Sequence, residues 1–377
     1  MEAYRTALTD WLACAVAGRD EPAARAAAAL GDPVAFAGTA GHVLDFDDTF
    51  APGLAHLSAP TAPAALLVGA ETGATVGEVL DAYAAGFEAM GLLSAANHPA
   101  LRERGWHPTA VCGVVGAAVA AAALLGADRE QAERLALLQA AGLQGAFGSD
   151  GKSLQVGLAA AAGVRAARLA EAGATVSAEA VAGFEQAYGA RKQGACPQPC
   201  TRKKGDRHLS CIEQNWVKAY PCCLQTHSAI EAAAQIGSVD GPLTVVVHPI
   251  SRLTAFRDDV TTGLEAKFSI PYLVAYTTLH GPPWVESFAV VDEEARALAA
   301  ERVTVRTDAA LLESEAVLER DGEPVARVEA ALGSPARPMD PPALAAKVRA
   351  LAGTRLDGVL DDRAAAARDA ARAAGLL

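Results

Sequence analysis

Residues 107–127 read HPTAVCGVVGAAVAAAALLGA. From Ala110 to Ala127 the stretch carries no charge, and its length is close to that of a short membrane span. Most of its side chains are Ala and Gly, however, so transfer into lipid would gain little free energy. Small side chains suit close packing against other helices. We therefore predict a buried core helix that starts just after His107 and Pro108, not a membrane span.

Besides this helix, the first two-thirds of the chain contains further Ala- and Leu-rich runs, separated by Gly, Pro or Asp. Thr75 and Glu78 have the spacing of a capping box, and Asp128 is placed to cap the run that follows it. Gly173 is placed to end the last run. We expect helices over residues 10–16, 22–30, 63–70, 75–96, 109–125, 129–141 and 154–172.

The pattern changes after residue 240. Short β-branched or alternating runs at 243–248, 302–307, 315–320 and 324–330 predict strands, and Asp321-Gly322 predicts a tight hairpin turn. Helical pattern returns at 344–351 and again from Asp361. These runs predict a mainly α protein with an α+β part. We place an all-helical domain at 1–213, completed by 338–377, and a smaller α+β domain at 214–337.

Size and charge narrow the function classes. The chain has 377 residues, enough for two domains with a large core. Asp and Glu number 44 against 32 Lys and Arg, a net charge of −12, which disfavours nucleic-acid binding. The seven Cys are an odd number, and the N-terminus lacks a basic-then-apolar signal pattern. Both features favour a reducing cytoplasm, with no nucleic-acid or membrane partner.

The segment His42–Thr49 (HVLDFDDT) is the first candidate for chemistry. Three Asp fall within four positions, including Asp45, and His56 follows a Pro-Gly turn. Crowded carboxylates repel one another, which raises some of their pKa values and calls for a compensating partner. The segment is consistent with a helix cap or turn, with a polar active-site loop, or with a divalent metal site.

The second candidate is His107, which precedes Pro108 at the expected start of the core helix and so is either a catalytic group or a simple helix-terminal residue. Lysine is also informative, because the chain has seven Lys against 25 Arg. We expect Lys192, Lys203 and Lys204 to lie in a surface loop at 189–206. We expect Lys347 to lie in an exposed tail helix. The remaining three lie at element boundaries beside Gly, Pro, His or Tyr: Lys152, Lys218 and Lys267.

The densest constellation is Lys218–His227 (KAYPCCLQTH). With Cys196, Cys200 and Cys211 upstream, its cysteines and His227 allow a zinc-site interpretation, although paired CxxC knuckles are missing. A Cys–His nucleophilic pair is a further alternative, but nothing local indicates a lowered thiol pKa. The residues alone leave these alternatives open.

These segments occur together in one family, because the sequence resembles the MmgE/PrpD family, which includes 2-methylcitrate dehydratase, cis-aconitate decarboxylase and iminodisuccinate epimerase. Five motifs in the family's order carry the resemblance, over nearly the whole chain: HVLDFDDT with His56, GWHPTAVCGVVGAA, GLQGAFGSDGKSLQVGLAAAAGVRAARLAEAG, KAYPCCLQTHSAI and GLEAKFSIPYLVAY. The resemblance implies a helical domain with an α+β lid domain, usually as a homodimer, without metal or cofactor.

The resemblance also implies a set of pocket residues. As catalytic residues it suggests Asp45, His107, Lys218, His227 and Tyr272; as substrate-binding residues it suggests Thr49, His56, Lys152, Lys267 and Ser269. The sequence departs from the decarboxylase branch at Cys223, where that branch has His, so decarboxylation is disfavoured. The Cys196–Cys211 loop has no counterpart in the family that we can place.

The implied substrates carry two or three carboxylates, and binding them in a protein of net charge −12 requires local cations. Removal of a proton α to a carboxylate builds negative charge that such cations stabilise. The leading hypothesis is a cofactor-independent lyase that dehydrates a small hydroxy polycarboxylate resembling an alkylcitrate. The alternatives are an isomerase or epimerase of an imino- or unsaturated dicarboxylate, and a catalytically inactive binding subunit.

Overall fold

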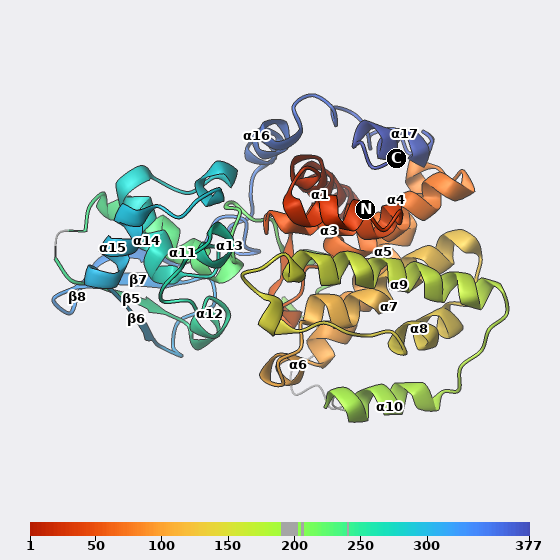
Figure 1. Ribbon diagram of the computed structural model, residues 1–377, viewed down its shortest axis with the longest axis horizontal. Helices are drawn as coiled ribbons and strands as arrows, with labels where there is room; N and C mark the ends of the chain where they lie inside the picture. The colour runs from red at the N-terminus through yellow and green to blue at the C-terminus, as the bar shows by residue number, and fades with distance from the viewer. Residues whose placement is uncertain (190–202, 205–206, 240) are drawn as a thin grey trace.

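The computed structural model describes residues 1–189, 203–204, 207–239 and 241–377. Its N-terminal part is a helical assembly, as the sequence predicts, and Figure 1 shows it separated laterally from the smaller part that contains the sheet. The helices of the first part are α1 (Glu2–Gly18), α2 (Pro22–Ala28), α3 (Pro33–Val43), α4 (Ser58–Thr72), α5 (Val76–Ala96), α6 (Ala100–Glu103), α7 (Pro108–Leu125), α8 (Arg129–Leu137), α9 (Gly151–Glu171) and α10 (Glu179–Tyr188).

Helix α7 lies at the centre of this assembly, in contact with α4, α5, α8 and α9. It is long and apolar enough to cross a membrane, but most of it is buried inside the protein. Small residues permit the close approach: a Cβ added to Gly163 of α9 would lie 2.5 Å from the backbone oxygen of Val114. The core-helix interpretation of residues 107–127 is therefore confirmed, and His107 is the N-cap residue of α7.

Helix α3 was not predicted from the sequence, although Asp32 caps it by accepting hydrogen bonds from the backbone nitrogens of Val34 and Ala35. It packs along α9, where a Cβ on Gly157 would lie 2.2 Å from the backbone oxygen of Ala35. This close pair brings the C-terminal end of α3 beside the N-terminal end of α9. The segment after His42 and the first turn of α9, with Lys152, therefore meet.

The smaller part contains a four-stranded sheet in the order β6–β5–β7–β8. Its strands are β5 (Leu243–Val247), β6 (Val303–Thr307), β7 (Ala316–Arg320) and β8 (Glu323–Val328), so all four predicted strands are confirmed. Strand β5 pairs parallel to β6 and antiparallel to β7, and β7 and β8 form the predicted hairpin. At its turn Asp321 and Gly322 both have positive φ, 53° and 83°.

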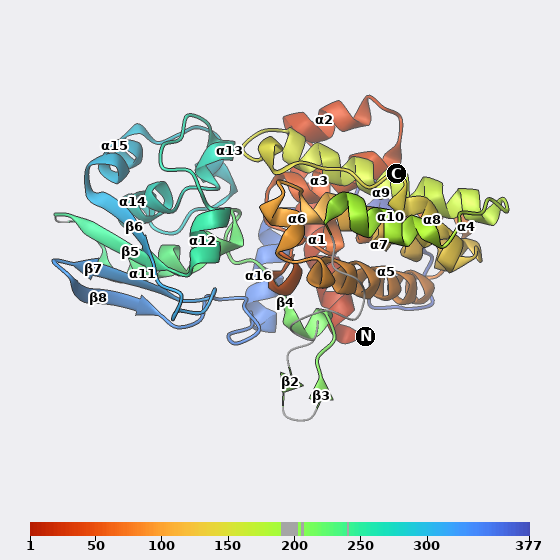
Figure 2. The same cartoon turned by 90° about the horizontal axis from the view of Figure 1, so that it is seen from below.

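The helices of the smaller part are α11 (His227–Ile236), α12 (Pro249–Thr254), α13 (Gly263–Ala266), α14 (Ile270–His280) and α15 (Glu293–Arg302). Of these, α11, α12, α14 and α15 contact the sheet, and Figure 2 shows α14 and α15 above the strands. The chain then returns to the helical part, where α16 (Pro341–Ala352) packs on α1 and α17 (Ala367–Ala373) packs on α4. The mainly α fold with an α+β part is thus confirmed.

The chain also contains short strands outside this sheet. β1 (Thr49–Phe50) pairs antiparallel with β4 (Asn215–Trp216), and this pairing joins the segment after α3 to the chain that enters the smaller part. β2 (Lys203–Lys204) pairs with β3 (Arg207–His208) in the predicted surface loop. Lys192, Cys196 and Cys200 of that loop lie outside the described residues.

Candidate active site

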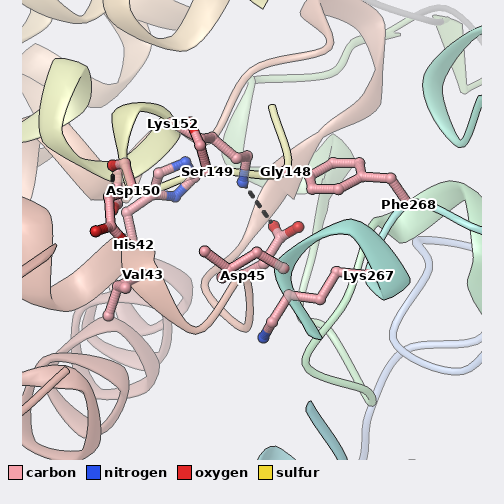
Figure 3. Close-up of a pocket in the computed structure, with 11 residues that line it drawn as sticks. His42, Val43, Asp45, Gly148, Ser149, Asp150, Lys152, Lys267 and Phe268 are labelled. Carbon is pink, nitrogen blue, oxygen red and sulfur yellow. Dashed lines mark hydrogen bonds and ion pairs between the residues drawn. The ribbon is translucent and has the colours of Figure 1, made fainter. Parts of the chain in front are cut away.

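Asp45 is the centre of a buried cluster at the end of α3. The chain reverses there with φ +55° at Asp45, a left-handed conformation that non-glycine residues adopt mainly where the surroundings hold them. Lys218 Nζ donates to Asp45 Oδ1 at 2.6 Å and to the Asp45 backbone oxygen at 2.8 Å. Lys152 Nζ lies 3.0 Å from the same Oδ1, as Figure 3 shows. One carboxylate therefore joins α9 to the start of the smaller part.

Charge within this cluster is well defined. Burial by itself would raise the pKa of Asp45, but Lys152 and Lys218 hold it well below its usual value. Burial opposes the charge of Lys218, yet Asp45 and Asp47 raise its pKa above the usual value. Lys218 is consequently a fixed cation. It supplies positive charge and shape to the site, and it is not a proton acceptor at neutral pH.

Lys347 corrects one sequence-based expectation. It does not lie exposed in the tail helix: it is 5% exposed, and its Nζ lies 2.7 Å from Asp10 Oδ1. The same Nζ donates to the backbone oxygens of Phe46 and Lys218, at 2.9 and 3.0 Å. The exposed-helix prediction failed because tertiary packing of α16 on α1 decides which face is covered. Lys347 therefore holds together the segment of Asp45 and the segment of Lys218.

Asp47 organises two histidines. Its Oδ2 lies 2.8 Å from His42 Nδ1 and 3.2 Å from His56 Nδ1. Burial would raise the pKa of Asp47, but the two imidazoles lower it, so the carboxylate stays ionised. An ionised carboxylate accepts a hydrogen bond from the N–H of each Nδ1, so in both neutral rings the unprotonated nitrogen is Nε2. The Oγ1 of Thr49 lies 3.5 Å from His56 Nδ1, at the limit of a hydrogen bond.

Burial lowers the pKa of His56 to about 3, although Asp47 acts in the opposite direction. The ring is therefore neutral at neutral pH, with a bare Nε2 that lies 3.8 Å from Asp45 Oδ1. A neutral imidazole that a carboxylate orients through Nδ1 is the usual arrangement of a histidine general base. A bound anion beside it would raise its basicity further.

Together His42, Asp47 and His56 have the donor types of a metal site, with one potential ligand atom from each within 4.8 Å of the others. The same three residues already contact one another, because both Nδ1 atoms lie within 3.2 Å of Asp47 Oδ2, whereas His42 Nε2 and Asp47 Oδ1 are buried without a hydrogen-bond partner among the described residues. A cation placed there would face the ammonium groups of Lys152 and Lys218 across Asp45. The local electrostatics thus favour an anionic ligand over a cationic one.

His107 has the opposite tautomer. Gln155 Oε1 accepts from the backbone nitrogen of Leu143 at 2.8 Å, and Gln155 Nε2 donates to the Leu143 oxygen at 3.2 Å. These two bonds fix the orientation of the amide, so its other N–H donates to His107 Nδ1 at 2.7 Å. The pKa of His107 is well below its usual value because of burial, followed by His42 and Lys152. A neutral His107 that accepts at Nδ1 carries its proton on Nε2.

These groups line a pocket between the helical part and the smaller part. The helical part contributes Asp45, Thr49, Leu54, His56, Arg102, His107, Phe147 and Lys152, and the smaller part contributes Cys223, Leu224, Gln225, Thr254 and Phe268. A neighbouring, smaller pocket shares Asp45, Lys152 and Phe268 and adds Lys267. Five of the ten predicted site residues therefore line the main pocket: Asp45, Thr49, His56, His107 and Lys152.

The other five predicted residues lie around the pocket. Lys218 is buried beneath Asp45, and Lys267 Nζ donates to the backbone oxygens of Leu44 and Pro221 at 2.6 and 2.9 Å. In Figure 3 the Lys267 amine is turned away from the Asp45–Lys152 pair. Burial lowers its pKa to about 8. Lys267 thus joins the segment after α3 to the segment after Lys218.

His227 is fully buried below the site, with its ring 5.1 Å from that of Tyr220. Ser269 caps α14 by accepting from the backbone nitrogen of Tyr272 at 3.2 Å. The hydroxyl of Tyr272 accepts from the backbone nitrogen of Asp292 at 3.0 Å, inside the smaller part. None of these three side chains lines the main pocket.

Four functional side chains were not among the predicted site residues. His42 and Asp47 belong to the segment already singled out, but its sequence does not show which carboxylate pairs with which ring. Gln155 lies three positions after Lys152, on the same face of α9, which is a usable signal. Arg102 has no local signal, since the chain has 25 Arg.

Comparison with known protein families gives two matches. The chain matches the MmgE/PrpD N-terminal domain over residues 32–195 and the MmgE/PrpD C-terminal domain over residues 220–372. None of the curated proteins matches it. The two matches span most of the chain, and proteins with these domains are typically enzymes, generally of the dehydratase type. The protein belongs to the MmgE/PrpD family.

Proposed function

We propose that the protein is a cofactor-independent lyase that dehydrates a small hydroxy polycarboxylate resembling an alkylcitrate. The observation that carries the proposal is the pair of neutral imidazoles with opposite tautomers in one cation-rich pocket. His56 offers a bare Nε2, and His107 offers an Nε2–H. Elimination of water needs both a proton acceptor and a hydrogen-bond donor for the departing oxygen.

The proposed steps follow from these roles. Lys152 binds a substrate carboxylate, and His56 Nε2 removes the proton from the adjacent carbon. The charge that develops on the carboxylate is stabilised by Lys152 and by the buried cation Lys218 behind Asp45. His107 Nε2–H donates to the β-hydroxyl as the carbon–oxygen bond breaks. The His56 imidazolium returns its proton to that oxygen, water leaves, and a carbon–carbon double bond remains.

Desolvation supports these steps, since Lys152 and His56 are almost completely buried as side chains, 9% and 12% exposed. Coulombic contacts are stronger in such a site than in water. Cys223 is a poor candidate for proton transfer, because burial raises the pKa of its thiol to about 11. This supports dehydration over the decarboxylation that the His-containing branch of the family performs.

The test is incubation of the purified protein with citrate-like and aspartate-like acids in heavy water. New absorbance at 240 nm with loss of water supports the dehydratase. Deuterium at the carbon next to a carboxylate, without loss of water, would replace it by the isomerase or epimerase alternative. Neither signal with any acid would favour a catalytically inactive binding subunit.

We extend the proposal to a homodimer in the cytoplasm that acts on a small carboxylic acid without metal, nucleic acid or membrane. The acidic composition and the burial of α7 support this setting. Exposed large apolar residues such as Leu138 and Leu158, 65% and 48% exposed, leave surface for a second copy. Light scattering at micromolar concentration should give twice the mass of one chain, and the monomer mass would contradict the dimer.

A further inference from the structure

Arg102 is a buried cation that the proposed reaction does not use. It lies on the short helix α6 and is only 5% exposed. Its Nη2 donates to the backbone oxygen of Leu253 in the smaller part, at 3.0 Å. Its Nε is buried without a hydrogen-bond partner, and no carboxylate lies within ion-pair distance in the part of the chain that the structure describes.

A buried guanidinium without a counter-ion is costly. Removing a charge from water has a large desolvation penalty, and an unsatisfied buried donor adds to it. Burial accordingly lowers the pKa of Arg102 from its usual value. Arginine nevertheless keeps its charge in proteins, so the penalty persists until an anion arrives. Since Arg102 lines the main pocket, a ligand there would supply that anion.

The position of Arg102 relative to Lys152 fits a single ligand. The Arg102 guanidinium carbon and Lys152 Nζ each lie 5.8 Å from the centre of the Phe147 ring, so at most twice that distance separates them. The Phe147 ring lies near both cations, and Leu54 also lines the pocket. A small acid with two carboxylates and a hydrocarbon part would therefore meet cationic and apolar groups in the same pocket.

A second unpaired group lies at the same pocket. The hydroxyl oxygen of Thr254, at the end of α12, is buried and has no hydrogen-bond partner among the described residues. Thr254 follows Leu253, whose carbonyl anchors Arg102, so both groups face the pocket from adjoining positions. A planar guanidinium with a neighbouring hydroxyl suits an oxygen anion.

We propose that Arg102, assisted by Thr254, binds a second carboxylate of the substrate in the pocket that Lys152 also lines. The inference rests on the proposed function and adds a specificity-determining residue to it. Lys152 holds the carboxylate next to the reacting carbon. Arg102 holds another carboxylate of the same substrate and so determines which acids are accepted. Because Arg102 also contacts Leu253, the bound ligand connects both sides of the pocket.

The experiment is calorimetric titration of the purified protein with propane-1,2,3-tricarboxylate, which has no hydroxyl to eliminate, and with butyrate, which has one carboxylate. Arg102→Gln should weaken tricarboxylate binding about 10- to 100-fold, as expected for loss of charge-assisted hydrogen bonds, and leave butyrate binding unchanged. Arg102→Lys keeps the charge without the fork and should give an intermediate loss. Arg104→Gln, an exposed position two residues along, is the matched control and should bind like the parent.

Lys152→Gln separates this proposal from the proposed function. If Lys152→Gln weakens tricarboxylate binding and Arg102→Gln does not, the Arg102 subsite is wrong and the proposed function stands. If Arg102→Gln weakens binding and Lys152→Gln does not, the subsite stands and the proposed role of Lys152 is wrong. Equal losses for tricarboxylate and butyrate in Arg102→Gln would mean a merely structural role. Absence of binding to the parent protein would overturn both.

Discussion

The two walls of the pocket differ in chemistry. The wall from the helical part holds the charged and imidazole groups: Asp45, His56, Arg102, His107 and Lys152. The wall from the smaller part holds Phe268, Leu224, a neutral Cys223 thiol and the side chains of Gln225 and Thr254. The charged and imidazole groups thus lie at or next to the ends of closely packed helices, which hold their geometry well. The smaller part mainly covers the reactive groups and supplies buried cations from behind.

The largest effect should come from breaking the connection between the walls. Lys218→Met removes one of the two ammonium groups that pair with the buried Asp45 carboxylate, so part of its charge is no longer compensated. Loss of one partner of a buried pair costs about 3–5 kcal/mol, so the free energy of unfolding should fall by that amount. Urea denaturation measures it, and turnover should fall with it.

The control for Lys218→Met is Arg349→Gln, which removes an ion pair between Arg349 and Asp357 on the protein surface. Their side chains are 66% and 54% exposed, and exposed pairs contribute about 0–1 kcal/mol. Equal losses of stability in the two variants would show that the buried pair does not join the walls.

A smaller effect is expected when the turnover of one variant from each wall is compared. Lys152→Met should reduce turnover about 100-fold, because it removes a cation that contacts the developing charge. Cys223→Ala, on the opposite wall, should change turnover by less than about threefold, since a neutral thiol contributes little to charge stabilisation. Steady-state kinetics with the acid identified in heavy water compares them. A loss for Cys223→Ala as large as that for Lys152→Met would contradict the division of roles.

The smallest effect is a change in how the free energy of unfolding depends on pH. Burial lowers the pKa of His227 to about 3, whereas an unfolded His titrates near 6.5. Between these values the unfolded state binds one more proton, so this residue makes stability fall as pH falls from about 6.5 towards 3, by about 1.4 kcal/mol per pH unit. His227→Phe should remove that contribution. Urea denaturation at pH 6 and pH 5 measures the slope.

The matched control for this variant is His280→Gln, at a position that is 39% exposed as a side chain. It should keep the slope of the parent protein. An unchanged slope in His227→Phe would mean that His227 is not buried as a neutral ring.

Periodicity and turn chemistry predicted most of the fold. The Asp321-Gly322 hairpin and the capping box of Thr75 and Glu78 are local signals, and the structure contains both. Helix α3 was missed because its sequence, PVAFAGTAGHV, is short and rich in Gly and Ala. Lys347 was misjudged because burial of a charge depends on a distant partner, here Asp10, which no local pattern shows.

The site was predictable to the extent that its motifs are local. Asp45, His56, His107 and Lys152 come from segments that stood out in the sequence, and they line one pocket. Tautomers and pairings were not predictable, because they depend on contacts such as Gln155 with the Leu143 backbone. Arg102 was not predictable for the same reason. It stands out because it has no counter-ion among the described residues, and only the three-dimensional structure shows this.

In the proposed reaction, His56 takes the proton from the carbon next to a substrate carboxylate, and His107 assists departure of the β-hydroxyl. Deuterium incorporation from heavy water and substrate turnover, measured together in His56→Ala and His107→Ala, test it most directly. His56→Ala should lose both signals by about 100-fold or more. His107→Ala should lose turnover while solvent deuterium still enters the carbon next to the carboxylate. Loss of exchange in His107→Ala with retained exchange in His56→Ala would contradict the account.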